Sequence, residues 1–281
     1  MDKGKLSIII PSRGEQFMPQ TVNDIFKKAK EDFEIIVILD GVWPAAFPVD
    51  RPNLVYVHRG ESQGMRAAIN SGASICHGEY LLKCDAHVMF DEGFDVKLKS
   101  DCEDNCVVIP RRYRLDAENW TILENGKPPE DYQYWIYPRK YNPMSLHGYR
   151  WDERTLARKD VLIDDTLTFQ GSCWFMRTEH FKRNKFLAVE GYEGLPQQEA
   201  EEIGLTTWLN GGRVVVNKKT WYAHLHKPKR GYAIPKEKAE RCYEFSYNHW
   251  VHGHKDGFVE LIERFWPIPN WPENWAERIY R

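Results

Sequence analysis

Short, nearly continuous apolar runs alternate with amphipathic stretches through the first half of the chain. Runs without strict apolar–polar alternation are typical of strands that a sheet buries on both faces. They occupy residues 6–10, 35–39, 54–57 and 79–84. Residues 19–31 and 65–76 instead repeat apolar side chains at helical spacing. This order predicts an α/β fold with a mostly parallel central sheet, right-handed crossovers and flanking helices.

The second half of the chain begins less regularly. Residues 107–110 form one more apolar run, and residues 111–166 then lose clear periodicity while carrying many Trp and Tyr side chains. So long an irregular stretch usually serves as a lid or a binding loop. Aromatic residues in irregular segments also build small local cores, and this alternative stays open. We expect an irregular aromatic insert at 111–166.

Regular elements return after the insert. They are strands at residues 168–176 and 213–217, an extended segment at 221–226, a helix at 197–209 and two tail helices at about 236–250 and 256–266. The helix at 197–209 has an acidic first turn, which the helix dipole favours even without a functional role. The tail after the second helix is rich in Pro and Trp.

Composition narrows the class of protein. The formal net charge is −2, so the chain has no global field that would attract nucleic acid. Its six cysteines lack the spacing of a zinc site, and we expect them to be reduced thiols. No apolar run reaches the roughly 18 residues of a membrane span, and no signal peptide precedes the first strand. These features predict a cytoplasmic protein without a membrane span.

Polar side chains follow three of the predicted strands. Arg13 lies in the loop after the first strand, Asp40 follows the second, and Asp85 and His87 follow the strand at 79–84. Ligands of parallel sheets bind outside the carboxyl ends of the strands, so we expect these residues at one crevice. In an extended segment, Asp85 and His87 would point to the same side. A carboxylate and an imidazole at one point suit Mn²⁺, or Mg²⁺ less well, holding a phosphate-bearing substrate.

Several segments resemble the GT-A fold nucleotide-sugar glycosyltransferases. LSIIIPSRGE and EIIVILDG are similar to the first two strands of the family 2 glycosyltransferases, and GMRAAINSGASICHGEYLLKCDAHVMF is similar to the block that ends in their Asp-x-Asp metal motif. Here the motif is Asp-x-His, which resembles more closely the polypeptide N-acetylgalactosaminyltransferases. TFQGSCWFMRTEHF, QEAEEIGLTTWLNGGRVVV and WYAHLH extend the resemblance, which covers roughly residues 5–110 and 168–226.

The resemblance implies a GT-A (Rossmann-like) fold. Its parts would be a nucleotide-sugar-binding half at 1–110, an acceptor-binding half at 111–226 that includes the insert, and a helical C-terminal extension at 227–281. The implied activity is that of a metal-dependent hexosyltransferase, which uses Mn²⁺ or Mg²⁺ and moves a sugar from a UDP-sugar to an acceptor hydroxyl. The Asp-x-His arrangement slightly favours retention of the anomeric configuration over inversion.

The resemblance also assigns roles in the second half. The segment WYAHLH would supply the third metal ligand after Asp85 and His87. Spacing alone does not separate His224 from His226, and the resemblance favours His224. The acidic helix would supply the residue that takes the acceptor proton in an inverting enzyme or binds sugar hydroxyls in a retaining one. The candidates for this role are, in order, Glu199, Glu202 and Glu201.

The other candidate substrate-binding residues come from both halves. Asp40 would accept hydrogen bonds from the nucleobase or ribose, Arg13 would contact the base or a phosphate, and Arg66 would reach the diphosphate. Gly171 would permit close approach of the sugar, where a side chain would clash. The remaining candidates are Pro11, Glu15, Asn70, Asp85, Trp135 and Gln198.

Other classes fit these residues less well. A nucleotidyltransferase would need a Gly-rich loop with several basic residues after the first strand, and residues 12–16 supply one Arg. A glycoside hydrolase would need a pair of carboxylates, which the sequence does not indicate. A non-catalytic nucleotide- or sugar-binding module stays an alternative. The acceptor is open, because the aromatic insert and the basic stretch at 227–238 suit a glycan, a peptide or a modified nucleic-acid base, as in virus-type DNA modification.

Overall fold

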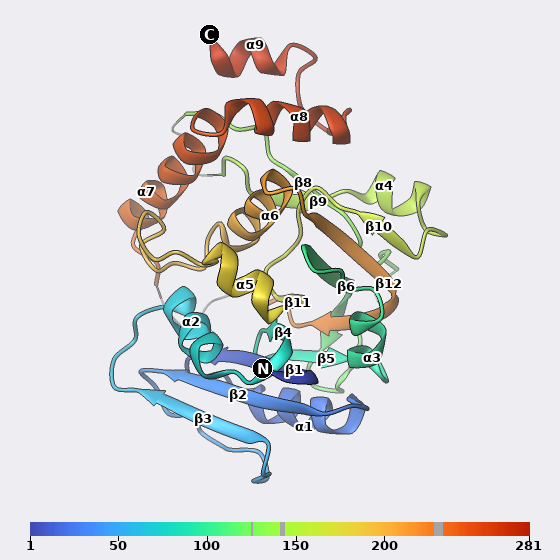
Figure 1. Ribbon diagram of the computed structural model, residues 1–281, viewed down its shortest axis with the longest axis vertical. Coiled ribbons are helices and arrows are strands. Elements are labelled where there is room, and N and C mark those ends of the chain that lie inside the picture. The colour runs from blue at the N-terminus through green and yellow to red at the C-terminus, as the bar shows by residue number, and fades with distance from the viewer. Residues whose placement is uncertain (125, 141–143, 228–232) are drawn as a thin grey trace.

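A computed structural model describes residues 1–124, 126–140, 144–227 and 233–281 of the protein (Figure 1). Part of the basic stretch, at 228–232, lies outside the described residues. The strands are β1 (Asp2–Ser12), β2 (Phe33–Asp40), β3 (Leu54–Arg59), β4 (Gly78–Cys84), β5 (Val88–Phe90), β6 (Cys106–Asp116), β7 (Thr121–Ile122), β8 (Gln133–Trp135), β9 (Gly148–Arg150), β10 (Ile163–Asp165), β11 (Cys173–Arg177) and β12 (Arg213–His224). The helices are α1 (Met18–Lys28), α2 (Met65–Ile75), α3 (Phe94–Lys99), α4 (Asp152–Ala157), α5 (Thr178–Asn184), α6 (Glu199–Leu209), α7 (Lys236–Ser246), the π-helix η1 (Tyr247–His252), α8 (Lys255–Phe265) and α9 (Trp275–Tyr280).

One mixed sheet forms the centre of the molecule, with the strand order β10-β12-β6-β11-β4-β1-β2-β3. The segment β4-β1-β2-β3 is parallel throughout, and β12 is parallel to β6. Strand β11 runs antiparallel between β4 and β6 and joins the two groups into a continuous sheet. The predicted α/β architecture with a mostly parallel central sheet is confirmed.

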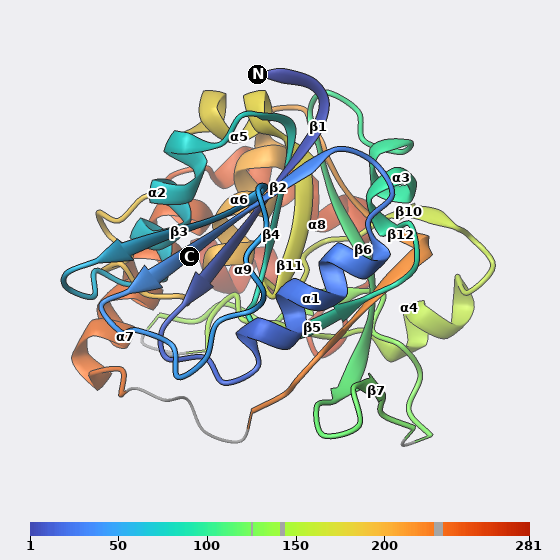
Figure 2. The same ribbon diagram turned by 90° about the horizontal axis from the view of Figure 1, so that it is seen from below.

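Helices cover both faces of this sheet (Figures 1 and 2). Ile8 and Ile10 of β1 pack in a cluster with α1 and α3, whereas Ile9 points to the opposite face and packs with α2 and α6. Because side chains alternate along a strand, each central strand contributes to both cores. Gly72 lets α2 lie close to the sheet, since a Cβ atom there would be 2.7 Å from Cγ2 of Ile9.

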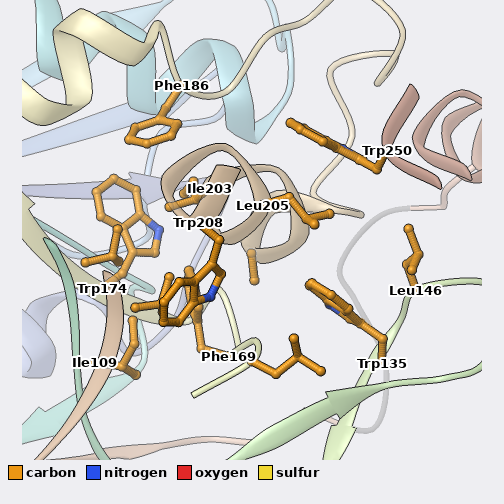
Figure 3. Packing of buried hydrophobic residues seen from close by; sticks show 14 of the residues in the cluster. Ile109, Trp135, Leu146, Phe169, Trp174, Phe186, Ile203, Leu205, Trp208 and Trp250 are labelled. Atoms are coloured by element: carbon orange, nitrogen blue, oxygen red, sulfur yellow. The ribbon is translucent and has the colours of Figure 1, made fainter. Parts of the chain in front are cut away.

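The insert at 111–166 is more ordered than the sequence predicts. Strand β6 extends into it, β8 and β9 pair as a small separate sheet, and α4 and β10 follow. Five of its aromatic side chains pack with α6 and the C-terminal helices in one large core (Figure 3): Tyr132, Tyr134, Trp135, Tyr137 and Trp151. Trp135, expected to contact substrate, is instead fully buried and stacks on Phe258 with ring centroids 6.1 Å apart. The alternative of a local aromatic core is therefore what the structure shows for Trp135.

The tail is helical, as predicted, but its boundaries differ. Helix α7 continues into the π-helix η1, and α8 follows. The pattern did not predict α9, which is held by tertiary contacts: Trp275 packs on Trp271 with ring centroids 5.6 Å apart, and Nε1 of Trp271 donates a hydrogen bond to the Trp135 carbonyl oxygen over 2.7 Å. These contacts close the core over the insert.

Two strands also differ from the prediction. Strand β11 begins at Cys173, so Gly171 lies in the turn before it. The segments at 213–217 and 221–226 form one strand, β12, because its second half pairs with the extended end of β6 as far as His224. Over the described ranges, no helix has the length and apolar character to cross a membrane. All six cysteines are buried and free.

Candidate functional site

A large cavity opens at the carboxyl ends of β1, β2 and β4, as predicted for a parallel sheet. Its volume is about 690 Å³. The sequence-predicted residues that line it are Pro11, Arg13, Glu15, Asp40, Asp85, His87, Gly171, Gln198, Glu199, Glu201 and His224. The structure therefore brings together side chains from both halves of the chain at one place.

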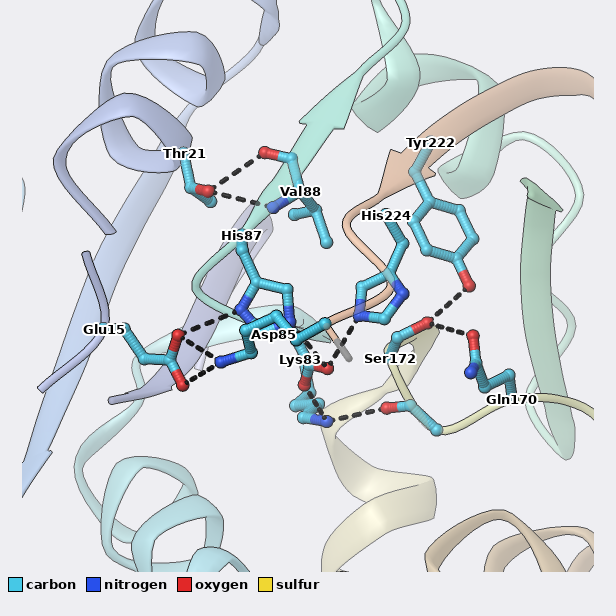
Figure 4. Close-up of polar contacts among 12 residues, drawn as sticks. Glu15, Thr21, Lys83, Asp85, His87, Val88, Gln170, Ser172, Tyr222 and His224 are labelled. Carbon is cyan, nitrogen blue, oxygen red and sulfur yellow. Dashed lines mark hydrogen bonds and ion pairs between the residues drawn. The ribbon is translucent and has the colours of Figure 1, made fainter. Parts of the chain in front are cut away.

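Asp85, His87 and His224 meet on the floor of this cavity (Figure 4). One ligand atom from each lies within 4.8 Å of the others, so the three side chains could hold a metal ion. His226 also lines the cavity but is not part of this group. Among the described residues, the structure therefore groups His224, and not His226, with Asp85 and His87.

The local geometry differs from the extended segment that the sequence predicts. Strand β4 ends before Asp85, and residues 86 and 87 form a bend that leads into β5. Strand β5 pairs antiparallel with β12, with Val88 opposite His224. This pairing turns the chain away from β4 and brings the rings of His87 and His224 to a centroid distance of 4.9 Å. The two ends of the Asp-x-His motif converge through strand pairing rather than through the pleat of one strand.

The charge states at this group suit a cation. Burial alone would raise the pKa of Asp85, but Lys83 and the hydrogen bond from His224 hold it well below the ordinary value. Burial lowers the pKa of His224 to about 4, against the opposing effect of Asp85. At neutral pH the site therefore offers an ionised carboxylate and a neutral imidazole, which are the ligand forms that divalent metals bind.

Glu15 orients His87 from the opposite side. Its carboxylate lies 3.1 Å from Nδ1 of His87 and 2.7 Å from Nζ of Lys227 (Figure 4). Burial opposes ionisation of Glu15, but His87 and Lys227 together lower its pKa. A carboxylate at Nδ1 leaves Nε2 of the ring free for a ligand.

Lys83 joins this group to the acidic helix. Its ammonium is fully buried and lies 2.8 Å from Oδ1 of Asp85, 2.6 Å from the Gly171 carbonyl oxygen and 3.2 Å from Oε1 of Glu199. Burial would lower the pKa of Lys83, but Asp85 and then Glu199 raise it. Glu199 also accepts a hydrogen bond from Nε1 of Trp174 over 2.8 Å. Its carboxylate is thus held at the cavity wall by two donors.

Glu201 lines the cavity on the side of the insert. Oε1 accepts a hydrogen bond from the backbone N–H of Gly148 over 3.1 Å. Burial raises the pKa of this carboxyl group to about 7. The neighbouring Gln198 also lines the cavity, and its Oε1 accepts a hydrogen bond from Ser246 of the tail over 2.6 Å. Insert and tail therefore both support this wall.

Asp40 lies in the cavity wall at the end of β2. Its two carboxylate oxygens accept hydrogen bonds from the hydroxyl of Ser62 and from the backbone N–H groups of Gln63 and Gly64. The carboxylate therefore organises the loop that begins α2. Oδ2 accepts two of these hydrogen bonds and Oδ1 accepts one, so only Oδ1, which also lies 3.5 Å from the guanidinium of Arg59, keeps a second lone pair.

Besides Trp135, three of the predicted site residues do not line the cavity. Arg66 is completely buried, and its guanidinium donates to backbone carbonyls and to Glu202. Glu202 faces this guanidinium instead of the cavity, and Asn70 donates to the Leu187 carbonyl oxygen over 2.9 Å. All three residues lie on helices, as predicted, but the loop before α6 covers the faces that carry them.

Lys83 and Trp174 were not among the candidates. A lysine between apolar residues in LLKCD is a recognisable signal, because a lysine in a buried strand is rare unless it is paired. Trp174 carries no such signal, since a tryptophan in an apolar strand is usually core. Its role depends on the position of Glu199, which comes from a different element.

Residues 7–184 match the family model described as Glycosyl transferase family 2. A Drosophila melanogaster protein assigned by its description to the polypeptide N-acetylgalactosaminyltransferases is 23% identical over 259 residues, a match that covers 83% of this chain and 44% of that protein. The chain thus spans less than half the length of this relative.

Solved structures show the same fold. The crystal structure of GalNAc-T7 with UDP, GalNAc and Mn²⁺ matches with a TM-score of 0.70 and 15% identity, over 98% of this chain and 54% of that one. The crystal structure of S. aureus TarS 1-349 in complex with UDP-GlcNAc matches with a TM-score of 0.57 and 16% identity, over 92% and 72% of the two chains. These likenesses identify the fold as GT-A.

Proposed function

This chain belongs to the Glycosyl transferase family 2, and from that premise we propose that it moves a sugar from a UDP-sugar to an acceptor hydroxyl. The single observation that carries the proposal is the group of Asp85, His87 and His224 on the floor of the cavity. Support for UDP as the carrier comes from similar structures that were solved with UDP or UDP-GlcNAc. The cytoplasmic location expected from the sequence stays a prediction.

The residues of this group fit a bound divalent cation, Mn²⁺ in preference to Mg²⁺. One carboxylate oxygen and two imidazole nitrogens form a borderline donor set, which suits Mn²⁺ better than the harder Mg²⁺. Among the described residues, Nε2 of His224 lies 3.2 Å from Oδ2 of Asp85, a member of the same group, and Nδ1 is buried without a hydrogen-bond partner. When bound, the cation would neutralise charge that develops on the diphosphate leaving group.

The surrounding residues have distinct proposed tasks. Asp85 and His224 hold the cation, and Glu15 keeps His87 turned toward it. Asp40 and Arg13 hold the nucleoside end of the donor, at the ends of β2 and β1. The cavity, at about 690 Å³, is in the size range of sites for small-molecule ligands.

Glu199 is the proposed partner of the donor sugar. Its carboxylate is anchored by Lys83 and Trp174, which leaves it well placed to accept hydrogen bonds from sugar hydroxyls. Burial raises the pKa of Glu199, but a proton on this carboxylate would break its ion pair with Lys83, so we assign it to sugar binding and not to proton transfer. This arrangement favours the retaining alternative. Glu201, whose pKa is raised to about 7, is the carboxyl group better suited to exchange a proton near neutral pH.

A donor-hydrolysis assay tests the proposal. Purified protein is incubated with a panel of UDP-sugars, with and without Mn²⁺, and product anomers are read by NMR. We expect turnover of at least one donor only with Mn²⁺, and a fall of at least about 100-fold in Asp85→Asn. The matched control is Asp256→Asn, which alters an exposed carboxylate on α8.

Three results would contradict the proposal. Equal turnover with and without Mn²⁺ would show that the reaction does not need the metal. Undiminished turnover in Asp85→Asn would show that Asp85 is not part of the active site. UDP binding in calorimetry without any turnover of any donor would favour the non-catalytic binding module instead.

A further inference from the structure

A second, smaller cavity lies on the part of β6 that extends into the insert. Its volume is about 20 Å³, and it is lined by Arg112, Tyr113, Arg114, Leu123, Lys127, Pro128, Glu130 and Arg150. Four of these side chains are cationic and one is a carboxylate. A space of this size holds about one or two water molecules. It therefore admits the oxygens of a small anionic group but not a sugar ring or a base.

The strand register places this cavity next to the candidate metal group. Arg114 of β6 is the parallel neighbour of His224 in β12, and Arg112 is the neighbour of Tyr222. Neighbouring strands lie about 4.8 Å apart, and paired residues leave the sheet on the same face. Both arginines therefore rise from the face that carries His224.

Protein groups leave part of the positive charge uncompensated. Arg112 pairs with Glu130 at 2.9 Å, and Arg150 pairs with Asp152 at 2.7 Å. Arg112 is only 6% exposed, yet its Nε atom is buried and has no hydrogen-bond partner in the described part of the chain. Within the same part, Arg114 forms no ion pair. A buried donor without an acceptor is unfavourable, and a bound anion would supply the acceptor.

We propose that this cavity binds a phosphate group carried by the acceptor and so holds the acceptor hydroxyl at the metal-bearing end of the large cavity. The inference rests on the proposed transferase function and narrows its acceptor to phosphate esters. Guanidinium groups match phosphate oxygens in pairs, which explains the use of arginine here. An uncharged glycan would offer no anionic oxygens to Arg114 or to the unpartnered Nε of Arg112.

Inorganic phosphate is the probe for the test. It is titrated at constant ionic strength into the full chain and followed by ³¹P NMR, for the wild type, Arg114→Gln and Arg114→Lys. We expect Kd to rise at least about 10-fold in Arg114→Gln and to recover in part in Arg114→Lys, which restores the charge. The matched control is Arg278→Gln on α9, an exposed arginine outside the cavity, with an unchanged Kd. Equal Kd values in all four proteins would overturn the inference.

Phosphate also has the chemistry of the donor diphosphate, so Asp85→Asn is titrated in parallel. Binding that persists in this variant but weakens in Arg114→Gln belongs to the small cavity. Binding that changes in Asp85→Asn alone belongs to the large cavity and overturns the inference. Competition by a dinucleoside phosphodiester or by a hexose 6-phosphate would support the inference and identify the class of ester, whereas failure of both to compete would overturn it.

The two proposals fail in different ways. If the transferase function is wrong, the donor assay shows no Mn²⁺-dependent turnover while phosphate binding still depends on Arg114. If only the acceptor inference is wrong, donor turnover depends on Mn²⁺ and on Asp85, while phosphate binding is insensitive to Arg114.

Discussion

The carboxylate of Glu202 forms a buried ion pair with the guanidinium of Arg66, which lies 136 positions earlier in the chain. The sequence predicts both side chains in the substrate cavity, but in the structure they face each other outside it. Glu202 also accepts a hydrogen bond from the backbone N–H of Ala188, and Arg66 donates to the carbonyl oxygens of Leu195 and Gln197. The pair therefore fastens α2 to α6 through the loop between α5 and α6.

Removal of one charge from this pair should destabilise the fold. We expect Glu202→Gln to lower the free energy of unfolding by about 3–5 kcal/mol, because it leaves the buried Arg66 charge uncompensated. Urea unfolding followed by tryptophan fluorescence measures this. Glu263→Gln, on an exposed position of α8, is the control with a change of less than about 0.5 kcal/mol. A loss below about 1 kcal/mol in Glu202→Gln would mean that the pair is not decisive for stability.

Gly171 should not tolerate a side chain. A Cβ atom there would lie 2.6 Å from Oε2 of Glu199, so the carboxylate would have to leave its contacts with Lys83 and Trp174. We expect Gly171→Ala to reduce donor turnover at least about 10-fold and the free energy of unfolding by about 1–3 kcal/mol. Gly60→Ala, where a Cβ atom would meet nothing within 4 Å, is the matched control. Normal turnover in Gly171→Ala would show that the absence of a side chain at this position is not needed to keep Glu199 in place.

Glu201 should make the fold less stable at alkaline pH. Its pKa is about 7 in the folded protein, against an ordinary value of 4.5, with burial as the leading cause. The folded state therefore holds a proton that the unfolded state releases, and the resulting stabilisation, complete below pH 4.5, is lost as pH rises through 7. We expect Glu201→Gln to be more stable than the wild type by up to about 3 kcal/mol at pH 8 and equal to it at pH 4. Urea unfolding across this range tests the prediction, and a difference that is independent of pH would contradict it.

His180 on α5 should act in the opposite direction. Burial lowers its pKa from 6.5 to about 4, and its Nε2 lies 3.2 Å from the hydroxyl of Thr207. The unfolded state then binds a proton that the folded state excludes, so stability is lost as pH falls from about 6.5 to about 4. We expect this residue to account for about 3 kcal/mol over that interval. His180→Gln should unfold with a flatter pH dependence, whereas His252→Gln, at an exposed position, should follow the wild type.

The sequence by itself determined the order of elements and the place of the site. Continuous apolar runs reveal the buried strands, because a strand covered on both faces has no polar side to show. Polar residues at the ends of these runs mark the crevice, since chain direction and right-handed crossovers put those ends on one edge. Asp40, Asp85 and His87 were found in this way from local pattern alone.

Only the tertiary structure decided which candidates share the cavity. The choice between His224 and His226 depends on the pairing of β5 with β12, and the separation of Glu201 from Glu202 depends on how α6 is rotated against Arg66. Trp135 became core because the tail packs over it. These outcomes rest on contacts between segments far apart in the chain, and local periodicity contains no information about such contacts.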